Sequence, residues 1–223
     1  MIKAVFFDMN ETLLNLSLLK NQFDKHFDDD HVLKYWFTKL LLSSTVMGIM
    51  DEYRNFGELA EVALENLFIE NQKPLSLSVK TEILGEFKKL PAYEDVKPAL
   101  TMLRAHDIRV IALSNSSLKM IQEQLANAQI YDLFDAVYSV DSVAKYKPFK
   151  DIYQSVTEQE ALKSEEIIMV ATHDWDLFGA KKAGLSTAFI KRKEGMYHPY
   201  YQKADFEDSD LVSLMQQIIT IHL

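Results

Sequence analysis

Side chains that can support nucleophilic catalysis follow apolar runs at four places in the chain. They are Asp8 and Thr12, then Ser114 and Asn115, then Lys147, and finally His173, Trp175 and Asp176. A carboxylate that attacks a substrate needs a cation and hydroxyl or amide donors to hold it and to stabilise developing charge. Lys147 supplies a cation, and Asp176 can position or deprotonate a water molecule. These residue types fit a site in which Asp8 is the attacking group.

The apolar runs before these residues predict the strands of a parallel sheet. They cover residues 2–7, 109–113, 136–140, 167–171 and 187–190. Segments with a helical period alternate with them at 94–106, 118–127, 150–162 and 175–183. This alternation indicates an α/β fold with a Rossmann-like, doubly wound parallel sheet. In such a sheet the loops after the strands lie along one edge, so we expect the candidate side chains to converge there.

The region between the first two predicted strands has a different pattern. It lacks strand runs and is typical of helices, including 30–46 and 56–71, with a break at Lys73 and Pro74. We therefore predict a core domain of residues 1–14 and 91–223 and a helical cap domain, or lid, of residues 15–90. A lid inserted at this point covers the carboxyl ends of the strands, where open α/β sheets bind their ligands.

Composition excludes several classes of protein. The chain has 223 residues, 48% of them apolar and 26% charged, which is typical of a folded globular protein. The absence of cysteine excludes disulfides and thiol catalysis and is compatible with a cytoplasmic location. The net charge of −9 disfavours nucleic acid as a partner, because the basic cluster at 191–193 is small. No secretory signal is expected at the start, and the longest apolar stretch, 40–50, is too short to cross a membrane.

The four motifs in this order resemble those of the haloacid dehalogenase superfamily, over nearly the whole chain. The resemblance rests on Asp8-x-Asn10-x-Thr12, Ser114-Asn115, Lys147-Pro148 and the loop that contains Asp176. Within the superfamily the chain looks most like the L-2-haloacid dehalogenase branch. The similar segments are 140–143, Tyr146 to Pro148, Tyr153, Trp175-Asp176 with Gly179-Ala180 and, in the lid, Trp36 and Tyr53-x-Asn55-Phe56.

The resemblance implies a metal-independent reaction without a cofactor. In that branch an aspartate displaces halide from a small 2-haloacid, and water then cleaves the resulting ester at the aspartate carbonyl. By this resemblance Asp8 is the nucleophile, Lys147 and Thr12 hold it, and Asp176 helps the water. Ser114 and Asn115 are expected to bind the substrate carboxylate or stabilise charge. The residues expected to contact the substrate are Met9, Asn10, Phe37, Phe56, Tyr153, His173 and Trp175.

Departures from the superfamily pattern keep other functions open. Phosphatases of the superfamily usually have a second aspartate at the place of Asn10 and a magnesium-binding aspartate at the place of Thr172. Halide leaves without a proton or a metal, so their loss favours dehalogenation. A magnesium-dependent phosphatase of a small phosphate ester remains the alternative if Asp174 binds the metal.

A further departure lies in the lid. Phe37 takes the place at which the dehalogenase branch has a substrate-gripping arginine, so a catalytically silent binding protein is a third hypothesis. Trp36, in contrast, is expected to serve helix packing alone. Helical lids of this kind often dimerise, which makes a homodimer possible.

Overall fold

Six parallel strands form the centre of the protein, as the computed structural model of residues 1–222 shows. The strand order is β3-β2-β1-β4-β5-β6, and β1, β2 and β4 are buried almost throughout, as near-continuous apolar strands of a sheet covered on both faces must be. The strands are β1 (Ala4–Phe7), β2 (Arg109–Ser114), β3 (Ala136–Ser139), β4 (Ile167–Ala171), β5 (Ser186–Ile190) and β6 (Phe206–Asp208).

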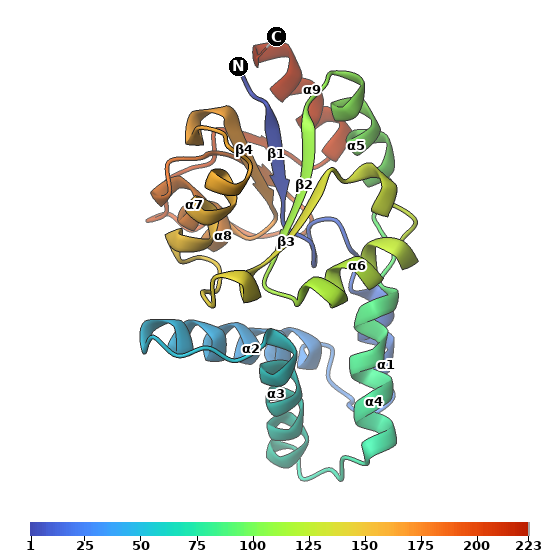
Figure 1. Ribbon diagram of the computed structural model, residues 1–223. Coiled ribbons are helices and arrows are strands. Elements are labelled where there is room, and N and C mark those ends of the chain that lie inside the picture. The colour runs from blue at the N-terminus through green and yellow to red at the C-terminus, as the bar shows by residue number, and fades with distance from the viewer. Residues whose placement is uncertain (223) are drawn as a thin grey trace.

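Helices cover both faces of this sheet, as Figure 1 shows. One face carries α5 (Val96–Ala105), α6 (Leu118–Asn127) and α9 (Leu211–His222), and the other carries α7 (Lys150–Gln159) and α8 (Asp174–Lys182). Short 3₁₀ turns are η2 (Tyr131–Leu133), η3 (Val140–Ser142) and η4 (Ser164–Glu166). The predicted α/β class with a doubly wound parallel sheet is confirmed.

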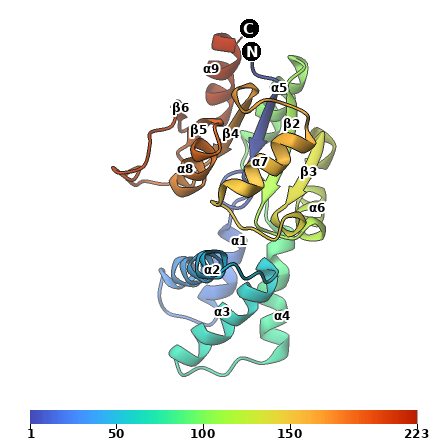
Figure 2. The same cartoon turned by 60° about the vertical axis from the view of Figure 1, so that its left-hand side comes forward.

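A group of helices lies beyond the carboxyl ends of the strands and forms the lid (Figures 1 and 2). Its members are α1 (Ser17–Asp24), α2 (Val32–Ile49), α3 (Phe56–Glu70), α4 (Leu77–Glu86) and η1 (Phe87–Lys89). Trp36 is fully buried among them and donates its indole N–H to the carbonyl oxygen of Ala60 at 3.2 Å, so it packs inside the lid.

The two chain segments that join lid and core run together at one point. The backbone N–H of Asn15 donates to the carbonyl oxygen of Pro91 at 2.8 Å. The division into a core of residues 1–14 and 91–223 and a lid of residues 15–90 stays a prediction, and this hydrogen bond is where we expect its boundary.

The loop before α3 joins the lid to the core at a second point. Asn55 caps α3 through a reciprocal capping box with Glu58, which fixes the start of the helix. The Asn55 amide also donates to both carboxylate oxygens of Asp141 in η3 at 3.1 Å, and the Tyr53 hydroxyl donates to the same carboxylate. The hydroxyl of Tyr146 donates to the carbonyl oxygen of Arg54 at 2.6 Å. These contacts hold α3 over the sheet edge.

The structure adds elements that the sequence pattern did not indicate. They are α9 and the three-residue strand β6, whereas α1 and α4 lie in the region predicted to be helical, without predicted bounds of their own. Among residues 1–222, no helix combines the length and the apolar character that crossing a bilayer requires.

Candidate active site

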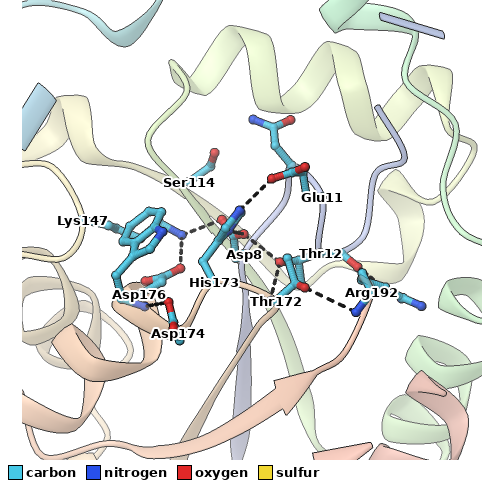
Figure 3. Close-up of polar contacts among 12 residues, drawn as sticks. Asp8, Glu11, Thr12, Ser114, Lys147, Thr172, His173, Asp174, Asp176 and Arg192 are labelled. Atoms are coloured by element: carbon cyan, nitrogen blue, oxygen red, sulfur yellow. Dashed lines mark hydrogen bonds and ion pairs between the residues drawn. The ribbon is translucent and has the colours of Figure 1, made fainter. Parts of the chain in front are cut away.

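Asp8 follows β1. β2 lies on one side of β1 and β4 on the other, so the strand order runs away from β1 in both directions along the sheet. Open α/β sheets bind ligands at such a switch point. One carboxylate oxygen of Asp8 accepts from Lys147 Nζ at 2.7 Å. The other accepts from Thr12 Oγ1 at 2.7 Å and lies 3.0 Å from His173 Nδ1 (Figure 3). Residues from three separate parts of the sequence thus meet at one carboxylate.

Lys147 lies between two buried carboxylates. Its ammonium donates to Asp8 and to Asp176, each at 2.7 Å, and to the carbonyl oxygen of Leu113 at 3.0 Å. Those three acceptors match the three N–H bonds of an ammonium group. Burial would lower the pKa of Lys147, but the charges of Asp176 and Asp8 outweigh it and raise the pKa. The lysine is therefore a fixed cation.

The two aspartates around Lys147 differ in the direction in which their pKa values are shifted. Burial alone would raise the pKa of Asp8, but Lys147 and His173 hold that pKa below its ordinary value. Asp176 is also fully buried, and burial together with the charge of Asp8 raises its pKa above the ordinary value despite Lys147. Environments that separate the pKa values of two acids give them different chemical roles. Asp8 is kept as an anion, which suits a nucleophile.

Tyr153 supports Asp176 from α7. Its hydroxyl donates to the Asp176 carboxylate and lies 3.1 Å from the Asp176 carbonyl oxygen. Burial and the neighbouring Asp176 charge raise the pKa of Tyr153 well above its ordinary value, so the hydroxyl stays a donor. The side chain is fully buried, and its observed partner is Asp176.

Thr12 connects the nucleophile to the start of the last motif. While its hydroxyl donates to Asp8, its oxygen accepts from the backbone N–H of Thr172 at 3.0 Å. Arg192, in the loop after β5, donates from Nε to the carbonyl oxygen of Thr12 at 3.0 Å. The loop that carries Asp8 is thereby held from two neighbouring segments.

His173 bridges two carboxylates. Nδ1 lies 3.0 Å from Asp8 and Nε2 lies 2.9 Å from a carboxylate oxygen of Glu11. The other oxygen of Glu11 pairs with the ammonium of Lys193. A chain of contacts therefore runs from the nucleophile through an imidazole and a carboxylate to a lysine, as Figure 3 shows in part.

Glu11 is a site residue that the sequence reasoning missed. Its backbone φ is 64°, in the left-handed region that costs a non-glycine residue roughly 1–2 kcal/mol. The side chain is nevertheless held by both His173 and Lys193. A strained residue kept at a site is a sign of function. The signal available in the sequence was a charged residue inside the motif that contains the nucleophile.

Ser114 and Asn115 line the cavity in front of Asp8. The Ser114 hydroxyl oxygen accepts from the backbone N–H of Ser116 at 3.1 Å. The amide carbonyl of Asn115 accepts from the backbone N–H of Lys147 at 2.8 Å, so it helps to position Lys147.

Asn10 is oriented by a residue that the sequence reasoning also missed. The fully buried Gln124 donates from Nε2 to the Asn10 amide oxygen at 3.1 Å and to the carbonyl oxygen of Phe87 at 2.8 Å. Asn10 Nδ2 lies 3.5 Å from Ser116 Oγ. The bond from Gln124 fixes the Asn10 amide oxygen on the side of α6.

The space in front of Asp8 is a cavity of about 20 Å³, which is room for roughly one water molecule. We call it the Asp8 cavity. Its described lining residues are Asp8, Asn10, Phe37, Leu41, Phe56, Ser114, Asn115, Lys147, His173 and Trp175.

Three expected site residues lie behind the wall of the Asp8 cavity rather than on it. Thr12 and Asp176 contact Asp8 and Lys147. Tyr153 contacts Asp176.

Met9 is placed differently from the expectation. It is completely buried and belongs to the hydrophobic core, because the chain turns after β1 so that Asp8 and Asn10 face the cavity.

The residues present do not fit the magnesium site of the superfamily's phosphatases. Both oxygens of Asp174 are engaged by backbone N–H groups, one of Trp175 at 2.8 Å and one of His198 at 2.9 Å. Lys147 already stands between Asp8 and Asp176. Within residues 1–222, no group of three or more histidine, aspartate or glutamate side chains is arranged to hold a metal ion.

Comparisons with known proteins agree with this arrangement. The chain is 25% identical over 217 residues to the (S)-2-haloacid dehalogenase of Pseudomonas sp. strain YL, covering 96% of this chain and 94% of that protein. It is 29% identical over 194 residues to the (S)-2-haloacid dehalogenase of Xanthobacter autotrophicus, covering 86% and 76% of the two chains.

The fold and the family follow from two further comparisons. A structure of L-2-haloacid dehalogenase from X. autotrophicus, with chloropropionic acid covalently bound, superposes with a TM-score of 0.89 at 25% identity and covers 98% of this chain and 99% of that one. The sequence model for haloacid dehalogenase-like hydrolases matches residues 5–190. The chain therefore belongs to the haloacid dehalogenase-like hydrolase family, as its motifs predicted.

Proposed function

We propose that this protein is a hydrolytic dehalogenase of small 2-haloacids that uses Asp8 as its nucleophile. The observation that carries the proposal is the charge arrangement at Asp8. Lys147 and His173 keep its carboxylate ionised although it is buried at the Asp8 cavity. The curated relatives and the solved structure described above are 2-haloacid dehalogenases, which favours a carbon–halogen bond as the target.

In the first half-reaction an Asp8 oxygen attacks C2 of the substrate. The new C–O bond forms as the carbon–halogen bond breaks, and the halide leaves with the bonding electron pair. No proton has to be supplied, so an amide at position 10 is sufficient. Lys147 and Thr12 hold the attacking carboxylate in place.

In the second half-reaction water attacks the ester carbonyl of Asp8, and the bond between that carbonyl carbon and the substrate oxygen breaks. The departing alkoxide oxygen takes the second proton of the water, so the 2-hydroxyacid leaves and the Asp8 carboxylate is regenerated. Esterification removes the negative charge of Asp8, so His173 keeps one carboxylate partner, Glu11, which holds the proton at Nε2. Once the Nδ1 proton that pairs with the Asp8 carboxylate has been released to solvent, Nδ1 can accept a proton from the water. We assign His173 as the general base and Glu11 as the residue that positions it. Asp176 stabilises Lys147 beside the ester.

The substrate carboxylate requires donors, because Phe37 lines the cavity where an arginine was expected by resemblance. Ser114, Asn115 and Asn10 are uncharged polar side chains that line the cavity, and we assign the substrate carboxylate to them. Phe56 and Trp175 provide apolar surface for the halogen and the C2 substituent.

Halide release from a panel of substrates tests the proposal. We expect turnover of haloacetates or 2-halopropionates that is unaffected by a chelator or by added magnesium. Phosphate esters should not be hydrolysed. Chelator-sensitive phosphate release without halide release from any haloacid would overturn the proposal. No turnover of either class, with ligand binding intact, would favour a binding protein instead.

The cytoplasmic location and the homodimer stay predictions. Analytical ultracentrifugation of the purified protein tests directly whether it is a homodimer.

A further inference from the structure

A second, larger cavity shares Phe56 with the Asp8 cavity. Its volume is about 530 Å³, within the range of about 300–1,000 Å³ that is typical of small-molecule pockets. It is formed by α2, α3, α4 and η1 of the lid together with the start of α6. We call it the side cavity. Its apolar lining residues are Leu40, Phe56, Ala60, Leu84, Phe87 and Met120.

The wall of the side cavity is mostly apolar, and its charged residues have partners. Lys88 pairs with Glu123 and Lys89 pairs with Glu86, both at 2.9 Å. The side cavity therefore offers hydrocarbon surface and no free countercharge among its described lining residues. A ligand that fits it is an apolar chain rather than an anion.

Phe56 is the residue that the two cavities share. The lining of the side cavity also includes Ser116, the residue after the Ser114–Asn115 pair that lines the Asp8 cavity. A substrate with its C2 atom at Asp8 would thus have the side cavity next to it, at Phe56. The Asp8 cavity, at about 20 Å³, holds about one water molecule, so a haloacid enters it only when a lining side chain such as Phe56 moves, and a long substituent needs still more space.

We propose that the side cavity binds the alkyl chain of 2-haloacids longer than 2-halopropionate, with the Phe56 ring turning aside to let the chain pass. This inference rests on the proposed dehalogenase function and names its substrate class. Each methylene buried in an apolar cavity contributes roughly 0.8 kcal/mol, which is about a four-fold gain per CH₂. The gain should appear in kcat/KM and continue until the chain fills the side cavity.

Gly85 offers a way to fill the side cavity without disturbing Asp8. It lies in α4, lines the side cavity, and a Cβ atom built on it meets nothing within 4 Å. Gly85→Leu therefore adds volume at the cavity wall, and it also replaces a poor helix former. Gly195 is the matched control, because its Cβ would also meet nothing and it lies outside the lining residues. Ala60→Leu is a second filling variant from α3.

The test compares kcat/KM for 2-bromopropionate, 2-bromobutanoate, 2-bromohexanoate and 2-bromooctanoate. We expect rising values for the unmodified protein. Gly85→Leu should lower kcat/KM for the two longest acids by at least ten-fold while leaving 2-bromopropionate within two-fold, and Gly195→Leu should change neither. The inference would be overturned if kcat/KM of the unmodified protein fell with chain length. It would also be overturned if both filling variants lost kcat/KM equally for all substrates.

A binding measurement separates this inference from the proposed function. Calorimetric titration with octanoate and propionate, neither of which carries a halogen, needs no turnover. We expect octanoate to bind more tightly than propionate and Gly85→Leu to remove the difference. If no haloacid releases halide but octanoate still binds in this way, the proposed function is wrong, while the inference that the side cavity binds alkyl chains is supported. Equal binding of the two acids would overturn the inference that the side cavity binds alkyl chains, even if halide is released.

Discussion

At the residue scale, the charge of Lys147 is shared between two buried acids, Asp8 and Asp176. It is the cation nearest to both Asp8 and Asp176, at 2.7 Å from each. An opposite charge so close favours the ionised carboxylate, and removal of that charge leaves desolvation unopposed. The lysine therefore sets how far the pH can fall before the nucleophile is protonated.

Lys147→Ala should reduce turnover by several orders of magnitude and move the acid limb of the pH–rate profile. The folded pKa of Asp8 is depressed, so the active anion persists as the pH falls below the usual aspartate value. Without Lys147 that pKa rises, so activity should be lost at a higher pH. A pH profile of kcat/KM measures the shift. Lys145→Ala is the control, because Lys145 pairs with the exposed Asp51. An unmoved acid limb would show that Lys147 does not govern Asp8.

His173→Asn should slow hydrolysis of the ester more than its formation. Loss of a general base typically costs ~10²–10⁴-fold in the step it serves. We therefore expect a burst of halide followed by slow turnover, and accumulation of the Asp8 ester in the intact mass of the protein. Glu11→Gln should give a weaker effect in the same direction, because the imidazole is kept and loses only a charged partner.

The comparison of Glu11→Gly with Glu11→Gln separates strain from function. Glycine relieves the left-handed backbone at this position, so Glu11→Gly should keep or raise the melting temperature while it also slows ester hydrolysis. For the His173→Asn variant of the preceding prediction, equal slowing of ester formation and ester hydrolysis would instead make His173 a substrate-binding residue.

Residue types predicted part of this site. Asp8 and Lys147 were identifiable because a carboxylate and a cation each follow an apolar run. The contact between His173 and Glu11 was not, because it depends on the left-handed turn at Glu11, and side-chain directions in a turn are not set by spacing. Gln124 lies on a helix far along the chain and gave no signal of its contact with Asn10.

At the element scale, the loop after β5 supports the loop after β1. Its Arg192 guanidinium donates to both oxygens of Asp95 at 2.6 and 2.9 Å, contacts the carbonyl oxygen of Thr12, and lies 4.2 Å from the ring centre of Tyr93. The basic cluster at 191–193, which composition left without a role, thus contributes Arg192 to the backbone of Thr12 and Lys193 to the side chain of Glu11.

Arg192→Met should destabilise the protein by about 3–5 kcal/mol, because it leaves the largely buried Asp95 without its bidentate partner. At roughly 2–4 °C per kcal/mol for a chain of this size, the loss is readily measured by thermal unfolding. Arg104→Met is the matched control, since the more exposed pair of Arg104 with Asp135 should contribute only ~0–1 kcal/mol. Equal melting temperatures for the two variants would contradict this role of Arg192.

The elements that the sequence predicted are those with strong local patterns. The strand β4 and the helix α6 have the bounds that their apolar patterns predicted. The strand β6 was missed because it has three residues, two of them acidic, and forms only by pairing with β5. The helices α1 and α4 are short, and their apolar faces are defined by contact with each other rather than by a long repeat.

At the scale of the whole molecule, the lid and the core together enclose the chemistry. The Asp8 cavity takes Phe37, Leu41 and Phe56 from the lid and its charged groups from the core. The sequence predicted an inserted lid because helical patterns interrupt the alternation of strands and helices. How close the lid lies to Asp8 and how large the side cavity is depend on packing between segments that are distant in the sequence. A local sequence pattern does not contain that information.

Incorporation of heavy oxygen from water into Asp8 tests the central claim most directly. A single turnover of 2-chloropropionate in H₂¹⁸O, followed by mass spectrometry of the peptide that contains Asp8, should place the label on the Asp8 carboxylate and leave the first product molecule unlabelled. Asp8→Asn should fold, because its shape is kept, and release no halide. Label found in the product alone, with Asp8 unlabelled, would show direct attack by water and contradict the ester mechanism.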